Sequence, residues 1–200
     1  MLTWVRHIFN RSHDAEERQR WWDARVAEME DVLGPCDGTV WHTPSPLHRH
    51  GYADVIRFRE YVSGITYVTC DLIGNNRQIP NRWGHYELVM CTRTEDEWPP
   101  SMLSRLAQYT HDAVLEPGDT MDIGSARPND STIAALLFAR PDPPASSFTV
   151  LGTPANLLLC VGITAAEFAG CKNFGSGVVL RILKENNIYP FTDLQRESVT

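Results

Sequence analysis

The stretch Tyr67–Leu106 constrains the fold of this 200-residue chain more than any other segment. An apolar run at Ile65–Ile73 leads into a loop rich in Gly, Asn and Pro, and a second apolar run follows at His85–Arg93. Because the loop Gly74–Gly84 is too long for a tight hairpin, we expect two strands joined by a wide connection. A helix over Trp98–Thr110 comes next, with prolines in its first turn, where a missing N–H group is tolerated. This order predicts a sheet with a helix packed on it.

Four further segments have the composition of strands. Ile133–Ala139 and Leu157–Ile163 are almost wholly apolar, which is typical of central strands that are buried on both faces. Phe148–Leu151 is a short strand between them, and Asp54–Tyr61 alternates apolar and charged residues like a half-buried strand. Strands and helices do not alternate regularly, so we expect an α+β fold in a single domain: a mixed, largely antiparallel β-sheet core with flanking helices.

Helices are expected towards both ends of the chain. Asp14–Leu33 has apolar residues at the spacing of a helix, and Thr3–Asn10 is expected to form one or two further helical turns that need a surface to dock on. Thr164–Glu167 has the pattern of a capping box that opens a short helix, and Ser176–Asn186 is the final helix.

The breaking residues after the first helix indicate the domain organisation. Gly38, Pro44, Pro46 and Gly51 predict a loop over Cys36–Gly51. We therefore divide the chain into an N-terminal helical segment, residues 1–34, and an α+β domain, residues 35–200.

Charge, cysteine content and hydropathy exclude several classes of partner. The formal net charge is −7, whereas a protein that binds nucleic acid needs a basic footprint. The five cysteines include no Cys-x-x-Cys pair, which disfavours a disulfide framework and favours a reducing compartment. The longest apolar runs are far shorter than the ~20 residues that span a bilayer. We expect a cytoplasmic protein with no nucleic-acid or membrane partner.

A histidine-rich segment offers one alternative function. His42, His48 and His50 lie close together, and with Asp54 they have the donor types of a metal site in a metal-dependent hydrolase. The prolines and glycine within the segment leave no regular element to fix the geometry of such a site. An exposed polar loop is the favoured interpretation, and we expect no metal and no cofactor.

Glu87 has both a chemical and a structural interpretation. It stands in an apolar strand, where a buried carboxylate needs a partner. It is either a catalytic acid or a structural group, and we favour the structural group. The structural group would pair with Arg57, Arg77 or Arg196, or would accept hydrogen bonds from loop N–H groups.

Three other features have both a packing interpretation and a chemical one. The glycines of Phe174–Gly177 precede a helix and could face a phosphate, but a helix–helix turn with Ser176 as N-cap explains them better. Trp83 and Trp98 bracket a strand and are either recognition residues or core. Cys70 and Cys91 lie in expected strands, where packing explains them better than nucleophilic catalysis.

Several motifs, in their order along the chain, resemble the suppressor-of-fused-like domain family. The motifs are Tyr67-Val68-Thr69, Tyr86–Met90, Trp98-Pro99 before a helix with Leu103 and Leu106, Leu115–Thr120, Leu136–Phe138, Leu157–Ile163 running into Thr164–Glu167, and Asp193 with Arg196. The resemblance covers roughly Trp41–Arg196. One departure is Cys70–Gly74, which stands where the family usually has a Gly-Met-Ser-like turn.

The resemblance implies binding without catalysis. In animals, suppressor of fused sequesters transcription factors, and stand-alone bacterial members look like immunity proteins of polymorphic toxin systems. We therefore expect a non-enzymatic, bacterial immunity-type protein that binds and neutralises a cognate toxin domain, and the acidic net charge fits a basic toxin. A further alternative is a subunit of a larger assembly that docks through Trp4, Ile8 and Phe9. The sequence assigns no protein-binding residue.

Overall fold

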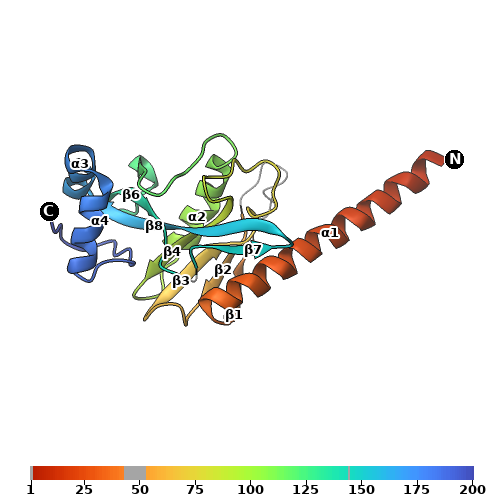
Figure 1. Cartoon of the computed structure of the whole chain (residues 1–200), viewed down its shortest axis with the longest axis horizontal. Coiled ribbons are helices and arrows are strands. Elements are labelled where there is room, and N and C mark those ends of the chain that lie inside the picture. Colours follow the sequence, from red (N-terminus) through yellow and green to blue (C-terminus); the bar gives the residue numbers. More distant parts are fainter. Residues whose placement is uncertain (1, 43–52, 144) are drawn as a thin grey trace.

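A computed structural model describes the backbone of residues 2–42, 53–143 and 145–200, and the side chains of these residues from Ala15 onward. The elements are, in chain order, α1 (Leu2–Leu33), β1 (Cys36–Trp41), β2 (Val55–Phe58), β3 (Ile65–Thr69), β4 (His85–Thr92), α2 (Trp98–Tyr109), β5 (Thr120–Asp122), the 3₁₀ turn η2 (Gly124–Ala126), β6 (Ile133–Ala139), β7 (Phe148–Val150), β8 (Thr153–Thr164), α3 (Ala165–Phe174) and α4 (Ser176–Glu185) (Figure 1).

The described strands form one mixed sheet. Its order is β1-β2-β3-β4-β8-β6-β5, and β7 also pairs with β8. β4 and β8 are parallel, with Leu88 opposite Leu158, and the other pairs are antiparallel. These observations confirm the predicted α+β class in a single domain, with a mixed, largely antiparallel sheet.

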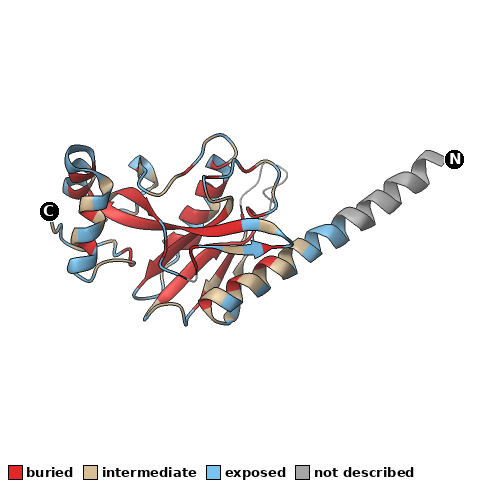
Figure 2. Cartoon of the chain, in the orientation of Figure 1, coloured by how far each residue is buried: buried red, intermediate tan, exposed pale blue. Residues whose placement is uncertain are grey.

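Successive side chains along a strand point to opposite faces of the sheet, so the core is divided into two layers, one on each face. On β8, Leu157 and Leu159 belong to the layer that contains buried residues of α1, α3 and α4. The intervening Leu158 belongs to the layer that contains the buried residues of α2. Figure 2 shows the buried residues concentrated in the sheet and on the sheet-facing sides of the helices. The sheet is therefore covered by helices on both faces, and β8 contributes to both layers.

Helix α1 is longer than the sequence pattern indicated. It runs unbroken from Leu2 to Leu33, so the predicted helical turns over Thr3–Asn10 are confirmed as part of α1, and the predicted start of a helix at Asp14 was wrong. No Gly or Pro lies within this range, and nothing else in the sequence stops the helix. Residues 15–20 are exposed, and packing of the described side chains on the sheet begins at Trp21 (Figure 2). Within the described residues, no helix has both the length and the apolar composition that a membrane crossing requires.

Strand β1 replaces part of the predicted loop Cys36–Gly51. It pairs with β2, and the register shifts between Cys36 and Val40. Gly38 lies within this irregularity with a φ of +79°, a conformation that glycine adopts without a steric penalty. The glycine therefore permits an irregular strand where the sequence pattern indicated a break. Most of the remaining predicted loop, residues 43–51, lies outside the described residues.

The two predicted helix starts have different outcomes. The capping box is confirmed: the Thr164 hydroxyl accepts a hydrogen bond from the Glu167 N–H group at 3.3 Å, and the Glu167 carboxylate accepts one from the Thr164 N–H group at 2.9 Å. Ser176, in contrast, is not the N-cap of α4, because Gly175 occupies that position. The Ser176 hydroxyl instead donates a hydrogen bond to the carbonyl of Gly118 at 2.6 Å.

Two glycines with similar backbone conformations allow a test of how α1 is docked. Gly74 has a φ of +82°, and a β-carbon placed there would lie 2.4 Å from the ring of Trp21 on α1. Gly152 has a φ of +80° and has nothing within 4 Å of such a β-carbon. We predict that Gly152→Ala lowers the free energy of unfolding by about 1 kcal/mol through backbone strain alone. Gly74→Ala adds a steric clash and lowers it by about 2–4 kcal/mol.

Urea unfolding followed by circular dichroism measures both variants against the parent protein. Equal losses for Gly74→Ala and Gly152→Ala would show that Trp21 does not press on this loop, which contradicts the docking of α1 described above.

Candidate functional site

Glu87 is a structural carboxylate on β4. Its side chain is 0% exposed. One carboxylate oxygen accepts hydrogen bonds from the N–H groups of Leu72 and Ile73, both at 2.8 Å, and the other accepts one from the hydroxyl of Thr69 at 2.6 Å. The prediction of a carboxylate that binds loop N–H groups is therefore confirmed. Full burial leaves the carboxylate no direct access to a substrate.

The predicted ion pair of Glu87 with Arg57, Arg77 or Arg196 was wrong. Arg57 pairs with Asp37 and Glu95. Arg196 pairs with Glu167, the buried glutamate of the capping box, with a shortest N–O distance of 2.5 Å. The sequence could not show that these arginines have other carboxylates nearer to them in the fold.

Arg25 of α1 is the cation that acts on Glu87. Burial raises the pKa of Glu87 to about 7, while the charge of Arg25 and the hydrogen bonds of Thr69 and Ile73 oppose this rise. Arg25, itself buried, donates a hydrogen bond to the carbonyl of Ile73 at 3.2 Å. The same short loop thus binds Glu87 of the sheet and Arg25 of the helix.

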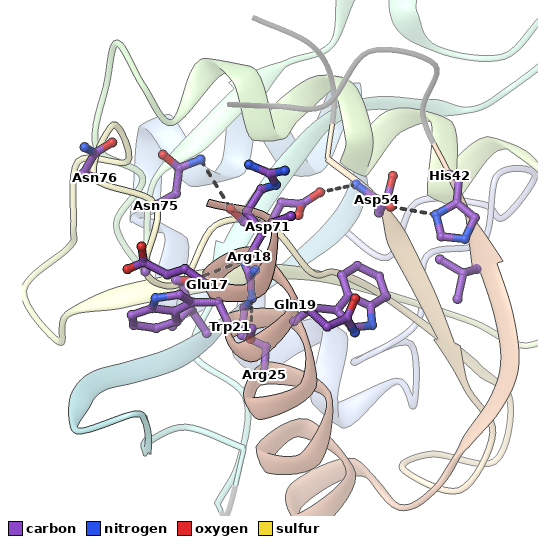
Figure 3. A pocket seen from close by; sticks show the side chains of 15 residues that line it. Glu17, Arg18, Gln19, Trp21, Arg25, His42, Asp54, Asp71, Asn75 and Asn76 are labelled. Atoms are coloured by element: carbon purple, nitrogen blue, oxygen red, sulfur yellow. Dashed lines mark hydrogen bonds and ion pairs between the residues drawn. The ribbon is translucent and has the colours of Figure 1, made fainter. Parts of the chain in front are cut away.

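A polar groove of about 1130 Å³ lies between α1, the end of β1 and the loop after β3 (Figure 3). We call it the α1 groove. His42 Nδ1 lies 2.7 Å from Asp54 Oδ2, and the His42 side chain is 71% exposed. The Asp54 N–H group donates a hydrogen bond to the Asp71 carboxylate at 2.8 Å. Figure 3 shows these three residues in a row across the groove, and Glu17, Arg18 and Arg25 add charges of both signs.

The structure describes only part of the proposed histidine cluster. His42 is paired with Asp54, whereas His48 and His50 lie outside the described residues. The part of the chain that is described holds no group of three or more His, Cys, Asp or Glu residues that could bind a metal ion.

The five cysteines are free thiols, and four of them are buried. Burial raises the pKa of Cys91 to about 12 and raises that of Cys160 as well. Since the thiolate is the nucleophile, thiols in this environment are poorly reactive.

A second candidate site lies at the edge of the sheet formed by β5. Asp119 and Ile123, which flank this strand, form backbone hydrogen bonds with β6. In an antiparallel pair such bonds alternate, so Thr120 and Asp122 direct their N–H and C=O groups away from β6. Among the described strands none pairs with this side of β5. The edge therefore offers backbone groups to a further strand.

A groove of about 400 Å³ runs beside this edge. We call it the β5 groove, and it is lined by Tyr109, Val114, Leu115, Gly118, Asp119, Thr120, Met121 and Phe138. The Leu115 N–H group donates a hydrogen bond to the hydroxyl of the buried Tyr86 at 3.2 Å, which fixes the floor of the groove to β4.

Some large apolar side chains are exposed, and some of these line the β5 groove. In the described part of the chain the exposed ones are Ile79, Tyr109, Val114, Leu151 and Phe174. Tyr109 and Val114 line the groove. Ile79 is attached beside it by a hydrogen bond from its N–H group to the carbonyl of Thr110 at 3.0 Å. Phe174 is close in sequence to Ser176, which binds Gly118 of the lining.

Only Leu151, on the turn between β7 and β8, has no such link to the groove. Exposed apolar side chains beside an open sheet edge are suited to the docking of another molecule. Sequence reasoning did not identify these residues, because Tyr109 was counted with the apolar residues of α2, of which Met102, Leu103 and Leu106 are buried. Exposure is the only signal that separates Tyr109 from them.

The fold and the β5 groove together define a class of protein: an α+β domain that presents an open sheet edge with a groove beside it. The family model described as suppressor of fused protein (SUFU) matches residues 50–197. The chain therefore belongs to the suppressor of fused family, as the sequence motifs indicated. The search among curated proteins found no match.

Solved structures show the same fold. A chain in a crystal structure of the Sufu–Fu complex superposes with a TM-score of 0.70 at 14% identity, over 90% of this chain and 92% of that one. A SUFU homologue from Neisseria gonorrhoeae gives 0.67 at 17% identity, over 91% and 98%. Drosophila Suppressor of Fused gives 0.55 at 16% identity, over 80% of this chain and 42% of that one.

The raised pKa of Glu87 predicts a pH dependence of stability. A glutamate in the unfolded chain titrates near 4.5, and Glu87 in the folded chain near 7. Between these pH values the folded state keeps a proton that the unfolded state has lost, so the free energy of unfolding falls as pH rises, by about 3 kcal/mol in total. Glu87→Gln removes this titration, and its stability is expected to change much less across the same window.

Chemical denaturation at a series of pH values tests this expectation. The control is Glu185→Gln, which changes a glutamate on the surface of α4 with a side chain that is 65% exposed, and it should keep the parent profile. A parent protein whose stability rises from pH 5 to pH 7 with the same slope as Glu87→Gln would contradict the assignment.

Proposed function

We propose that this chain is a cytoplasmic protein-binding domain without catalytic activity that neutralises a cognate toxin domain, as the immunity-type proteins of bacterial toxin systems do. The observation that carries the proposal is the β5 groove. An unpaired strand edge beside exposed apolar side chains is suited to an extended segment of another protein.

The comparisons support a protein partner. One structure with this fold was determined in a Sufu–Fu complex, in which the relative is bound to another protein. The relative from Neisseria gonorrhoeae is covered over 98% of its chain, so a bacterial protein consists almost entirely of this one fold. The complex favours a domain that acts by association with another protein.

The binding mode follows from the geometry of the edge. An extended segment of the toxin would pair with the outward backbone groups of Thr120 and Asp122. Its alternate side chains would enter the groove beside Tyr109 and Val114. Because the segment belongs to the toxin, binding there would cover the adjacent surface of the toxin and so block its activity.

Long-range attraction would bring the two proteins together. The net charge of −7 produces a field that attracts a basic protein such as a nuclease toxin and accelerates the encounter. This electrostatic attraction depends on ionic strength, whereas contacts with the apolar side chains of Tyr109 and Val114 do not.

The absence of catalysis is supported by the state of the reactive groups. Glu87 is buried beneath a loop, and four of the five cysteines are buried thiols. His42 is exposed with Asp54 as its partner.

Two charge substitutions at apolar positions test the site. Val114 and Leu151 have similar exposures, 37% and 41%, but only Val114 lines the groove. We predict that Val114→Glu weakens binding of the cognate partner by about tenfold or more, because it places a charge in the apolar contact. Leu151→Glu should leave the affinity unchanged. The partner is first captured by the parent protein from its native lysate and identified by mass spectrometry, and affinities are then measured by calorimetry.

A growth assay tests neutralisation. Expression of the captured partner alone should arrest growth, and co-expression with the parent protein or Leu151→Glu, but not Val114→Glu, should restore it. A partner that is not toxic would overturn the immunity proposal. Equal losses of affinity in both variants would place the interface elsewhere.

A further inference from the structure

Two arginines lie against the same half-buried tryptophan. The guanidinium carbon of Arg82 is 4.8 Å from the ring centroid of Trp83, and that of Arg140 is 4.9 Å from it. Both distances are within the range of cation–π attraction. Trp98, the other tryptophan that brackets β4, packs against the α2 core and donates its indole N–H group to the carbonyl of Ala126. Trp83 therefore differs from Trp98 in having two cations against its ring.

The cluster of Arg82, Trp83 and Arg140 has excess positive charge. Arg82 is paired with Glu116 at 2.9 Å and is still 62% exposed. Arg140 donates a hydrogen bond to the carbonyl of Ser146 at 3.2 Å, and within the described residues no carboxylate pairs with it. Two guanidinium groups share one neutralising carboxylate, which leaves a net charge of about +1 on a protein of net charge −7.

The cluster is held in place before any ligand binds. Asn81 and Gly84 exchange two backbone hydrogen bonds, at 3.1 and 3.0 Å, and the side-chain oxygen of Asn81 accepts one from the N–H group of Trp83 at 3.0 Å. This closed turn fixes the indole. A rigid donor set loses less conformational entropy on binding than flexible surface arginines do.

The cluster also borders the β5 groove. Glu116, which holds Arg82, begins the turn that leads into β5. Within that turn the Gly118 N–H group donates a hydrogen bond to the carbonyl of Phe138 at 2.8 Å. Phe138 lines the groove, and Arg140 is two residues further along, on the same face of an extended chain. The positive charge therefore lies at the Thr120 end of β5.

We propose that Arg82, Trp83 and Arg140 form a carboxylate-binding site at the end of the β5 groove. The partner segment that docks on β5 is then an extended segment with an Asp or Glu side chain at the Thr120 end. This inference rests on the docking at β5 proposed above. Guanidinium groups are suited to this role because their planar N–H donors match a carboxylate.

A protein segment fits the site better than a nucleic acid. The cluster provides only two guanidinium groups, whereas a nucleic acid needs a series of basic contacts along its backbone. A single carboxylate requires only the two arginines.

Two synthetic peptides test the proposal by nuclear magnetic resonance on the isotope-labelled full chain. Both have the alternating core Thr-Val-Thr-Val-Thr, with Glu at each end in one and Gln at each end in the other, so that either strand direction places the end residue at the cluster. The Glu peptide is expected to bind about fivefold more tightly at low salt, with shifts at the Trp83 indole and at the amides of Thr120 and Asp122. High salt should reduce this preference.

Variants show whether the preference comes from the cluster. Arg82→Gln with Arg140→Gln should make the two peptides bind equally, while thermal unfolding shows that the fold is kept. Arg181→Gln is the matched control, because Arg181 is also an exposed arginine beside a glutamate, Glu185, and it should retain the fivefold preference.

The possible outcomes separate this inference from the function on which it rests. Equal binding of both peptides, with shifts at Thr120 and Asp122, would overturn the carboxylate site and leave β5 docking intact. A preference that survives in the double variant would also overturn it. If neither peptide shifts Thr120 and Asp122 at millimolar concentration, both proposals are contradicted. If single-stranded DNA shifts Trp83 at lower concentrations than the Glu peptide, the site belongs to nucleic acid instead.

Discussion

The carboxylate of Glu87 is the interaction on which the arrangement of the N-terminal half depends. β4 is a central strand, so the loop that leaves the adjacent β3 begins in the interior, where its N–H groups need acceptors. Glu87 accepts two of them, from Leu72 and Ile73. The orientation of this loop then brings the Ile73 carbonyl to Arg25 and Gly74 against Trp21. A buried charge in the sheet thus determines where the long helix can dock.

The second half of the same loop is held by another buried polar side chain and leads to the β5 groove. Gln78 donates a hydrogen bond to the carbonyl of Tyr86 at 2.7 Å and accepts one from its N–H group at 3.2 Å. The hydroxyl of Tyr86 accepts a hydrogen bond from the N–H group of Leu115, which lines the groove. Glu87 and Gln78 therefore fix the inner side of the loop, so that its outer side can present Trp83 in a defined place.

The sequence predicted the fold well where packing is decided by local pattern. The apolar run Ile133–Ala139 is β6 with the expected bounds, and the capping box forms as expected at Thr164. The pattern failed where tertiary contacts decide. β1 and the three-residue β5 exist because a neighbouring strand pairs with them. The candidate site was not predictable from the sequence. Val114 is an apolar residue like those of the core, and only the fold shows that its side chain is exposed.

The contrast between the overall charge and the arginine cluster has a physical rationale on an edge strand. A field from seven excess negative charges attracts a basic partner but does not specify how its segment aligns with β5. Alignment matters because a slip of one residue would turn the apolar side chains of the segment away from the groove. A positive site at one end, formed by Arg82 and Arg140 on Trp83, distinguishes the correct register from its neighbours through a single charged contact. Attraction and register would therefore be supplied by separate parts of the surface.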